Sequence, residues 1–108
     1  MKSLTKRSDG SISYDRMRET ETIENRRKRL RFRSWHRGTK EMDLLIGSFA
    51  DAHLSAFDRS QLDRFEALLD VSEPVVYDWI LGRSRLPAEF DHDVTQLLLA
   101  FELERPGR

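Results

Sequence analysis

Apolar residues recur at helical spacing through most of the chain from residue 23 onward. No stretch alternates apolar and polar residues with the period of two that a half-buried strand shows. Helices are predicted over residues 23–36 and 40–53, from Asp58 as an N-cap, from Ser72 to Gly82, and over residues 88–104. Short loops separate these segments, so the pattern predicts an all-α fold, a single small bundle of about five helices.

One face of each later helix is predicted to supply the core. Its members are Met42, Leu45, Ile46, Phe49, Ala50, Leu62, Phe65, Leu68, Leu69, Val75, Val76, Trp79, Ile80, Phe90, Val94, Leu97, Leu98 and Phe101. Gly47 lies inside the stripe and is expected to mark the close approach of a neighbouring helix. The last helix has the widest apolar stripe and is expected to be central, while Asp63 and Glu66 are placed on the wet face of the third helix.

Composition divides the chain into three parts. Residues 1–22 are rich in Ser and Thr with few large apolar residues, which predicts a flexible N-terminal tail. Residues 23–104 form the helical domain, and Pro106 and Gly107 predict that residues 105–108 fray. A mitochondrial presequence is the alternative for the tail, but its acidic residues argue against one.

The net charge of zero conceals a strong polarity along the chain. Residues 1–37 hold twelve Lys and Arg against five acids, and the remainder holds seven against fourteen. Such asymmetry favours electrostatic steering toward a charged partner. With no cysteine and only scattered histidines, no metal site is expected. No stretch is long enough to span a membrane, so no membrane partner is expected. A cytoplasmic location is expected, with the mitochondrial matrix less favoured.

The junction between the first two helices carries the candidate functional residues. Gly38 follows a run of helix formers and is expected to turn through the left-handed region. Thr39 is expected to cap the next helix, whose first turn holds Glu41 and Asp43 where the helix dipole favours negative charge. Arg37 and Glu41 therefore leave from different helices around a tight corner. The simplest interpretation is a capped helix junction with no further role.

Catalysis would need a nucleophile or a tuned acid–base group in a pocket. The chain has no glycine-rich phosphate loop, no serine elbow and no convergent spacing of His, Asp and Glu. Glu41 and Asp43 are expected to be ionised and wet in a first helical turn. The sequence therefore favours a binding module with no catalytic residues over an enzyme.

The run Arg37-Gly38-Thr39-Lys40-Glu41 resembles the RGxxE motif of small flavin assembly factors for succinate dehydrogenase and fumarate reductase. The resemblance covers about residues 24–104 and includes an Asp78-Trp79 pair in a later helix. The chain departs from many family members in carrying Thr39 and Lys40 where apolar residues are often found.

This resemblance implies a chaperone-like assembly factor. Such a factor binds the flavoprotein subunit of succinate dehydrogenase or fumarate reductase and promotes covalent attachment of FAD to a histidine of that subunit. FAD is then the cofactor of the client, and the factor, expected to be a monomer, holds none stably itself. Carried over to this chain, the resemblance implies that Arg37, Gly38, Glu41 and Asp43 form the docking corner.

A run of basic residues in the first helix supports an alternative, a small nucleic-acid-binding regulator. The run spans Arg26-Arg27-Lys28-Arg29 and continues with Arg31 and Arg33. A solvated helix face is the commoner reason for so short a run, and neither zinc spacing nor zipper heptads accompany it. Acidic residues in the following helix would also repel phosphate, so nucleic-acid binding is the less favoured interpretation.

Overall fold

The computed structural model describes residues 21–104, which form helices and turns and contain no strand. Five α-helices are present: α2 (Ile23–Trp35), α3 (Lys40–His53), α4 (Arg59–Asp70), α5 (Glu73–Ile80) and α6 (Asp93–Glu104). Two 3-10 turns, η1 (Leu54–Ala56) and η2 (Ala88–Phe90), precede α4 and α6. The predicted all-α fold is confirmed. Most of the predicted tail, and the predicted fraying of residues 105–108, lie outside the described residues.

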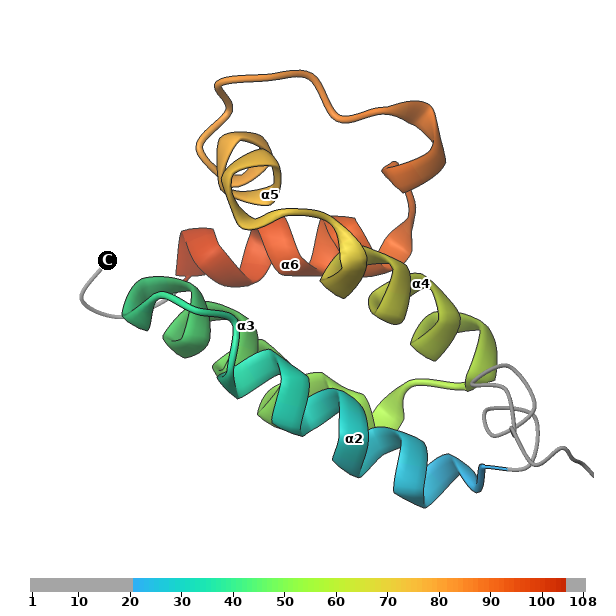
Figure 1. Ribbon diagram of the computed structural model, residues 1–108. Coiled ribbons are helices and arrows are strands. Elements are labelled where there is room, and N and C mark those ends of the chain that lie inside the picture. Colours follow the sequence, from blue (N-terminus) through green and yellow to red (C-terminus); the bar gives the residue numbers. More distant parts are fainter. Residues whose placement is uncertain (1–20, 105–108) are drawn as a thin grey trace, which may run out of the picture.

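The helices are arranged around a hairpin formed by α2 and α3, which lie side by side and are joined by a tight corner (Figure 1). Helix α4 packs against α2 and against α6, and α6 in turn packs against α3. Helix α5 follows α4 after two residues and is joined to η2 by a long exposed loop (Figure 1). This arrangement brings the start of α5 close to the start of α3.

The core is richest along α3, whose buried residues span almost its whole length. Phe49 is fully buried and its ring contacts the rings of Phe57, Phe65 and Phe101. The prediction that the last helix is central is wrong, because Leu97 and Leu103 of α6 are exposed by 37% and 68%. Part of the wide apolar stripe on α6 is therefore exposed to solvent, and the width of the stripe does not indicate a central helix.

The last helix also begins later than predicted, at Asp93 instead of residue 88. Residues 88–90 form the separate turn η2, and the backbone leaves helical geometry at Asp91. The side chain of His92 then accepts a hydrogen bond from the Thr95 N–H over 3.3 Å, as an N-cap does. The helix therefore starts where a polar side chain can satisfy its first amides.

Gly47 allows α2 and α3 to approach each other closely. A Cβ atom at this position would overlap the indole ring of Trp35. The prediction that Gly47 marks a close helix approach is confirmed. The Trp35 indole N–H donates across the same contact to Asp51 over 3.4 Å.

The basic run of α2 faces the acidic side of α4. Arg26 pairs with Asp63 at 2.6 Å and with Glu66 at 3.0 Å, and Arg29 pairs with Glu66 at 2.9 Å. Further along α2, Arg33 pairs with Asp70 at 2.9 Å. We call this row of contacts the α2–α4 seam.

Glu66 corrects the sequence-based expectation of a wet position, because it is only 5% exposed. Its carboxylate is covered by α2 and receives two guanidinium groups there, which offset the cost of removing it from water. Asp63, predicted on the same wet face, is indeed exposed, with 69% of its side-chain surface accessible.

Candidate functional site

The corner between α2 and α3 is built as a capped break between two helices. Gly38 has a φ of +128°, a backbone conformation that side-chain-bearing residues rarely adopt. Thr39 is the N-cap of α3, and its hydroxyl oxygen accepts a hydrogen bond from the Met42 N–H over 3.3 Å. Both expectations for the junction are confirmed. We call residues 37–43 the corner.

Asp43 holds the corner from the first turn of α3. One oxygen of its carboxylate accepts hydrogen bonds from the backbone N–H groups of Arg37 and Gly38. Hydrogen bonds to a charged acceptor are among the stronger ones in proteins. The Asp43 side chain therefore fixes the loop against the helix that follows it.

Arg37 points back into the protein. Its guanidinium donates to the backbone carbonyls of Leu69 and Val71, the latter over 3.1 Å, where α4 ends. Burial lowers the pKa of Arg37 from its ordinary value. Within residues 21–104 its Nε is buried without a hydrogen-bond partner. Arg37 thus fastens the corner to the end of α4.

The start of α5 completes the surroundings of the corner. The Thr39 hydroxyl donates to a carboxylate oxygen of Glu73 over 3.4 Å. The other carboxylate oxygen of Glu73 lies 3.2 Å from the place a Cβ atom on Gly38 would take. Glu73 was missed by sequence reasoning, because an acid in a first helical turn is common and does not indicate which element it will face.

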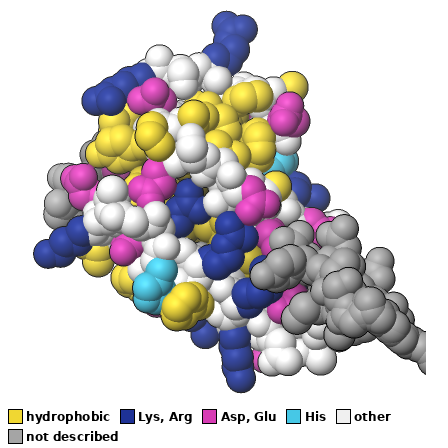
Figure 2. All heavy atoms as spheres, viewed as in Figure 1, with side chains coloured by type: hydrophobic (Ala, Val, Ile, Leu, Met, Phe, Trp, Pro, Cys, Tyr) yellow, Lys and Arg dark blue, Asp and Glu magenta, His cyan; other side chains and the backbone are white. Residues whose placement is uncertain are grey.

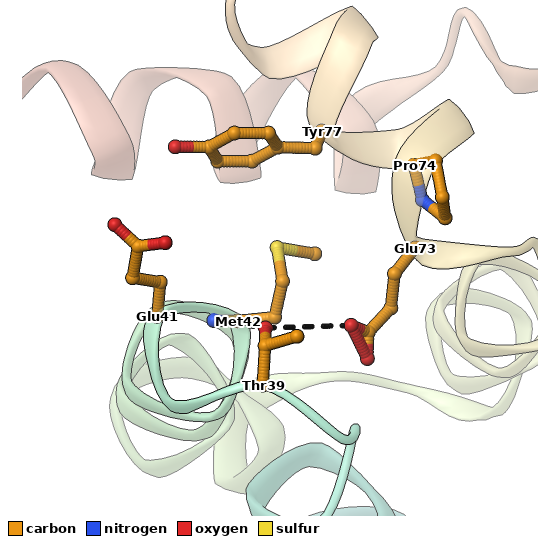
Figure 3. A pocket seen from close by; sticks show the side chains of 6 residues that line it. All are labelled: Thr39, Glu41, Met42, Glu73, Pro74 and Tyr77. Carbon is orange, nitrogen blue, oxygen red and sulfur yellow. Dashed lines mark hydrogen bonds between the residues drawn. The ribbon is translucent and has the colours of Figure 1, made fainter.

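A surface pocket of about 320 Å³ opens between the first turns of α3 and α5 (Figure 3). It is lined by Thr39, Glu41, Met42, Glu73, Pro74 and Tyr77. Glu41 lies on one side, Glu73 on the other, and the Tyr77 ring lies across from Met42 (Figure 3). We call this space the corner pocket.

Glu41 is exposed, and its carboxylate has no hydrogen bond or ion pair with any other residue of the described part. The sequence singled out Glu41 but gave no sign of Pro74 and Tyr77, which reach the corner from a helix more than thirty positions away. The structure thus brings Arg37, Gly38 and Asp43 together in one network and places Glu41 beside them, facing the pocket.

The Asp78-Trp79 pair lies on α5 away from the corner pocket. Trp79 is buried, and its ring centroid lies 5.2 Å from that of Phe90 in η2. Asp78 forms a 3.6 Å ion pair with Arg83. These contacts join α5 to η2 and to the loop that follows α5.

Residues 21–104 offer no candidate for a metal site or for a membrane-spanning helix. No group of three or more His, Asp or Glu side chains there is placed to hold a metal ion. None of the helices in this range is long and apolar enough to cross a membrane.

Comparison with known proteins identifies the family. The family described as "flavinator of succinate dehydrogenase" matches residues 28–102. The mitochondrial succinate dehydrogenase assembly factor 2 of Dictyostelium discoideum is 39% identical over 80 residues, which cover 74% of this chain and 57% of that protein. The FAD assembly factor SdhE of Acetobacter pasteurianus is 44% identical over 64 residues, 59% of each chain.

The matched stretch of these two relatives is a little under three-fifths of their length. The family match over residues 28–102 includes all of α3, α4 and α5, most of α2 and α6, and the corner with its pocket. The family match and the RGxxE run agree, and the chain belongs to the succinate dehydrogenase flavinator family.

Proposed function

We propose that this protein binds the flavoprotein subunit of succinate dehydrogenase or fumarate reductase and promotes covalent attachment of FAD to that subunit. Membership in the flavinator family supports this role, and so does the similarity to a bacterial FAD assembly factor. The observation that carries the proposal is the exposed Glu41, which has no partner among residues 21–104, beside a corner that Asp43 and Arg37 hold rigidly.

Within this proposal the four residues of the docking corner have different roles. Arg37 and Asp43 keep the corner in shape through bonds to the backbone at Val71 and Gly38. Gly38 allows close approach of the client backbone, and Glu41 meets a polar group of the client. A preformed corner lowers the entropy lost on binding, because its loop is already ordered.

The covalent chemistry belongs to the flavin, and the protein supplies orientation. A monomeric factor of this size acts by holding the client in the reacting arrangement. FAD stays with the client, and no flavin is retained stably by the factor. This assignment as an assembly factor instead of an enzyme agrees with the family. The compartment is that of the client, for which we favour the bacterial cytoplasm over the mitochondrial matrix.

The nucleic-acid alternative receives no support from the basic run. Arg26, Arg29 and Arg33 all pair with carboxylates of α4, which compensates their charge within the protein. Binding to phosphate would require these cations to be free to replace the counterions condensed on the nucleic acid. The assembly role is therefore the function we propose.

The first test separates docking from stability. Glu41→Ala is expected to abolish most client flavinylation, measured as covalent flavin fluorescence of the flavoprotein subunit after denaturing electrophoresis. The unfolding free energy should fall by only about 0.3–1 kcal/mol, since one exposed first-turn acid is lost.

Leu45→Ala is the control for this experiment. Leu45 is buried at 3% exposure, so its truncation should cost roughly 2–5 kcal/mol and reduce flavinylation only as far as it unfolds the protein. Full activity of Glu41→Ala, or a loss in step with its stability, would make the corner a capped helix junction and nothing more.

A further inference from the structure

The corner pocket has two carboxylates on opposite sides and apolar walls between them (Figure 3). Glu41 comes from the first turn of α3 and Glu73 from the first turn of α5. Met42, Pro74 and the Tyr77 ring supply the apolar surface. Figure 2, which views the molecule as in Figure 1, shows hydrophobic side chains gathered with acidic ones toward the α5 end of the visible face.

Neither carboxylate of the pocket is neutralised by an ion pair within residues 21–104. In that range Glu73 receives only the hydroxyl of Thr39, and Glu41 receives no donor. The charge of Glu73 reaches Arg37 and raises its pKa, but this effect is outweighed by burial, and the Arg37 guanidinium binds backbone carbonyls instead. The two carboxylates of the pocket therefore form no direct ion pair with a cation of residues 21–104, although Glu73 and Arg37 still attract each other.

Many other acids of the described part are compensated. Arginines pair with Glu21, Glu24, Asp51, Asp63, Glu66, Asp70, Asp78 and Asp93. Two carboxylates that face one small pocket without such a pair from residues 21–104 thus leave a position for a cation from outside the chain.

The size of the pocket limits what fits. Its volume of about 320 Å³ lies at the small end of the range of roughly 300–1,000 Å³ for ligand sites. A single long side chain suits this space better than a dinucleotide. A guanidinium group can bond a carboxylate with two parallel N–H groups and stack on an aromatic ring, whereas an ammonium group is a compact point charge. Apolar walls suit the methylene stem of either residue, so the choice of arginine rests on its guanidinium group.

We infer that the corner pocket receives an arginine side chain of the client flavoprotein. Its guanidinium lies between Glu41 and Glu73 and against the Tyr77 ring, and its stem packs on Met42 and Pro74. The inference rests on the proposed function and adds to it the chemistry by which the client is recognised. Glu73 and Tyr77 thereby become specificity residues beside the RGxxE run.

The test measures the affinity of the full chain for the apo flavoprotein subunit of succinate dehydrogenase at low and physiological salt. Glu41→Gln and Glu73→Gln keep the side-chain shape and remove the charge. Each should weaken binding about 3–10-fold, and the double variant about 10–100-fold. The double variant should also lose much of the salt dependence of wild-type binding, because the screened charge pair is gone.

Two further variants identify the group that binds. Tyr77→Leu should weaken binding several-fold without changing its salt dependence, since the ring carries no net charge. Glu89→Gln is the matched control, because Glu89 is an exposed acid of η2 that is absent from the corner pocket. It should bind the subunit as the wild type does.

Wild-type affinity and salt dependence in the double Gln variant would overturn the arginine pocket and leave the proposed function standing. Failure of the wild-type chain to bind the subunit at all would overturn the proposed function itself. If Glu73→Gln lowers the melting temperature, Glu41→Gln decides the question alone, since the Glu41 carboxylate has no hydrogen bond or ion pair within residues 21–104 to lose.

Discussion

The α2–α4 seam and the corner pocket both contain glutamates, yet they use them in opposite ways. In the seam, Glu66 is buried and bonded to Arg26 and Arg29. In the pocket, Glu41 is exposed, and Glu73 has only a hydroxyl partner among the described residues. Charges of the first kind join two helices, and charges of the second kind remain available to a molecule outside. The two groups of glutamates therefore differ in the partners that surround them and not in residue type.

The largest loss of stability is expected for a substitution that breaks the seam. Glu66→Ala leaves two guanidinium groups of α2 without their shared carboxylate, and we expect a loss of about 3 kcal/mol in unfolding free energy. Denaturant unfolding followed by circular dichroism measures the change. Asp63→Ala is the matched control, since its exposed carboxylate should contribute only about 0–1 kcal/mol. Equal losses in the two variants would mean that the seam behaves as an ordinary surface.

A smaller loss of stability is expected for a substitution in the corner, beside the proposed binding site. Asp43→Ala removes the acceptor for the Arg37 and Gly38 amides and should cost about 1–2 kcal/mol. Flavinylation should fall further than this loss explains, because the corner would lose its fixed shape. Asp43→Asn keeps an acceptor oxygen and should recover much of the activity. An Asn variant as inactive as the Ala variant would show that the negative charge itself is needed.

The smallest effect is a pH dependence beside the seam, where Glu21, just before α2, accepts hydrogen bonds from Arg29. The hydrogen bond from Arg29, the largest influence, lowers the pKa of Glu21 below its ordinary value. A lowered pKa in the folded state means that the contribution of Glu21 to stability is present above pH 4.5 and is lost as the pH falls through the folded-state pKa. Wild type and Glu21→Gln should therefore differ in stability near neutral pH and converge in acid. Parallel curves down to about pH 3 would contradict this role.

The sequence predicted most of what belongs to a single helix or a single junction. The period of apolar residues locates α3 and α4, and local chemistry locates the Gly38 turn and the Thr39 cap. Gly47 was also predictable, since a glycine inside an apolar stripe leaves room for the backbone or a ring of a neighbouring helix.

What the sequence could not predict depends on which elements meet. Glu66 is buried because α2 covers it, and the spacing of apolar residues within α4 does not indicate that contact. Tyr77 and Glu73 belong to the candidate site only because α5 returns to the start of α3. The inward direction of Arg37 likewise depends on carbonyls left free at the end of α4.

The bond from Arg37 to Val71 also has a consequence for how much the length of each connection can vary. Only two residues separate α4 from α5. The first of them, Val71, accepts the bond from Arg37, and Glu73 follows directly after the second. One inserted residue there would displace both the Val71 carbonyl, which Arg37 binds, and Glu73, which lines the corner pocket. Residues 81–87 between α5 and η2 carry neither, and all of them are exposed except Leu86, which packs against the core, so insertions should be tolerated among residues 82–85. Variation in chain length should therefore collect after α5 and be excluded before it.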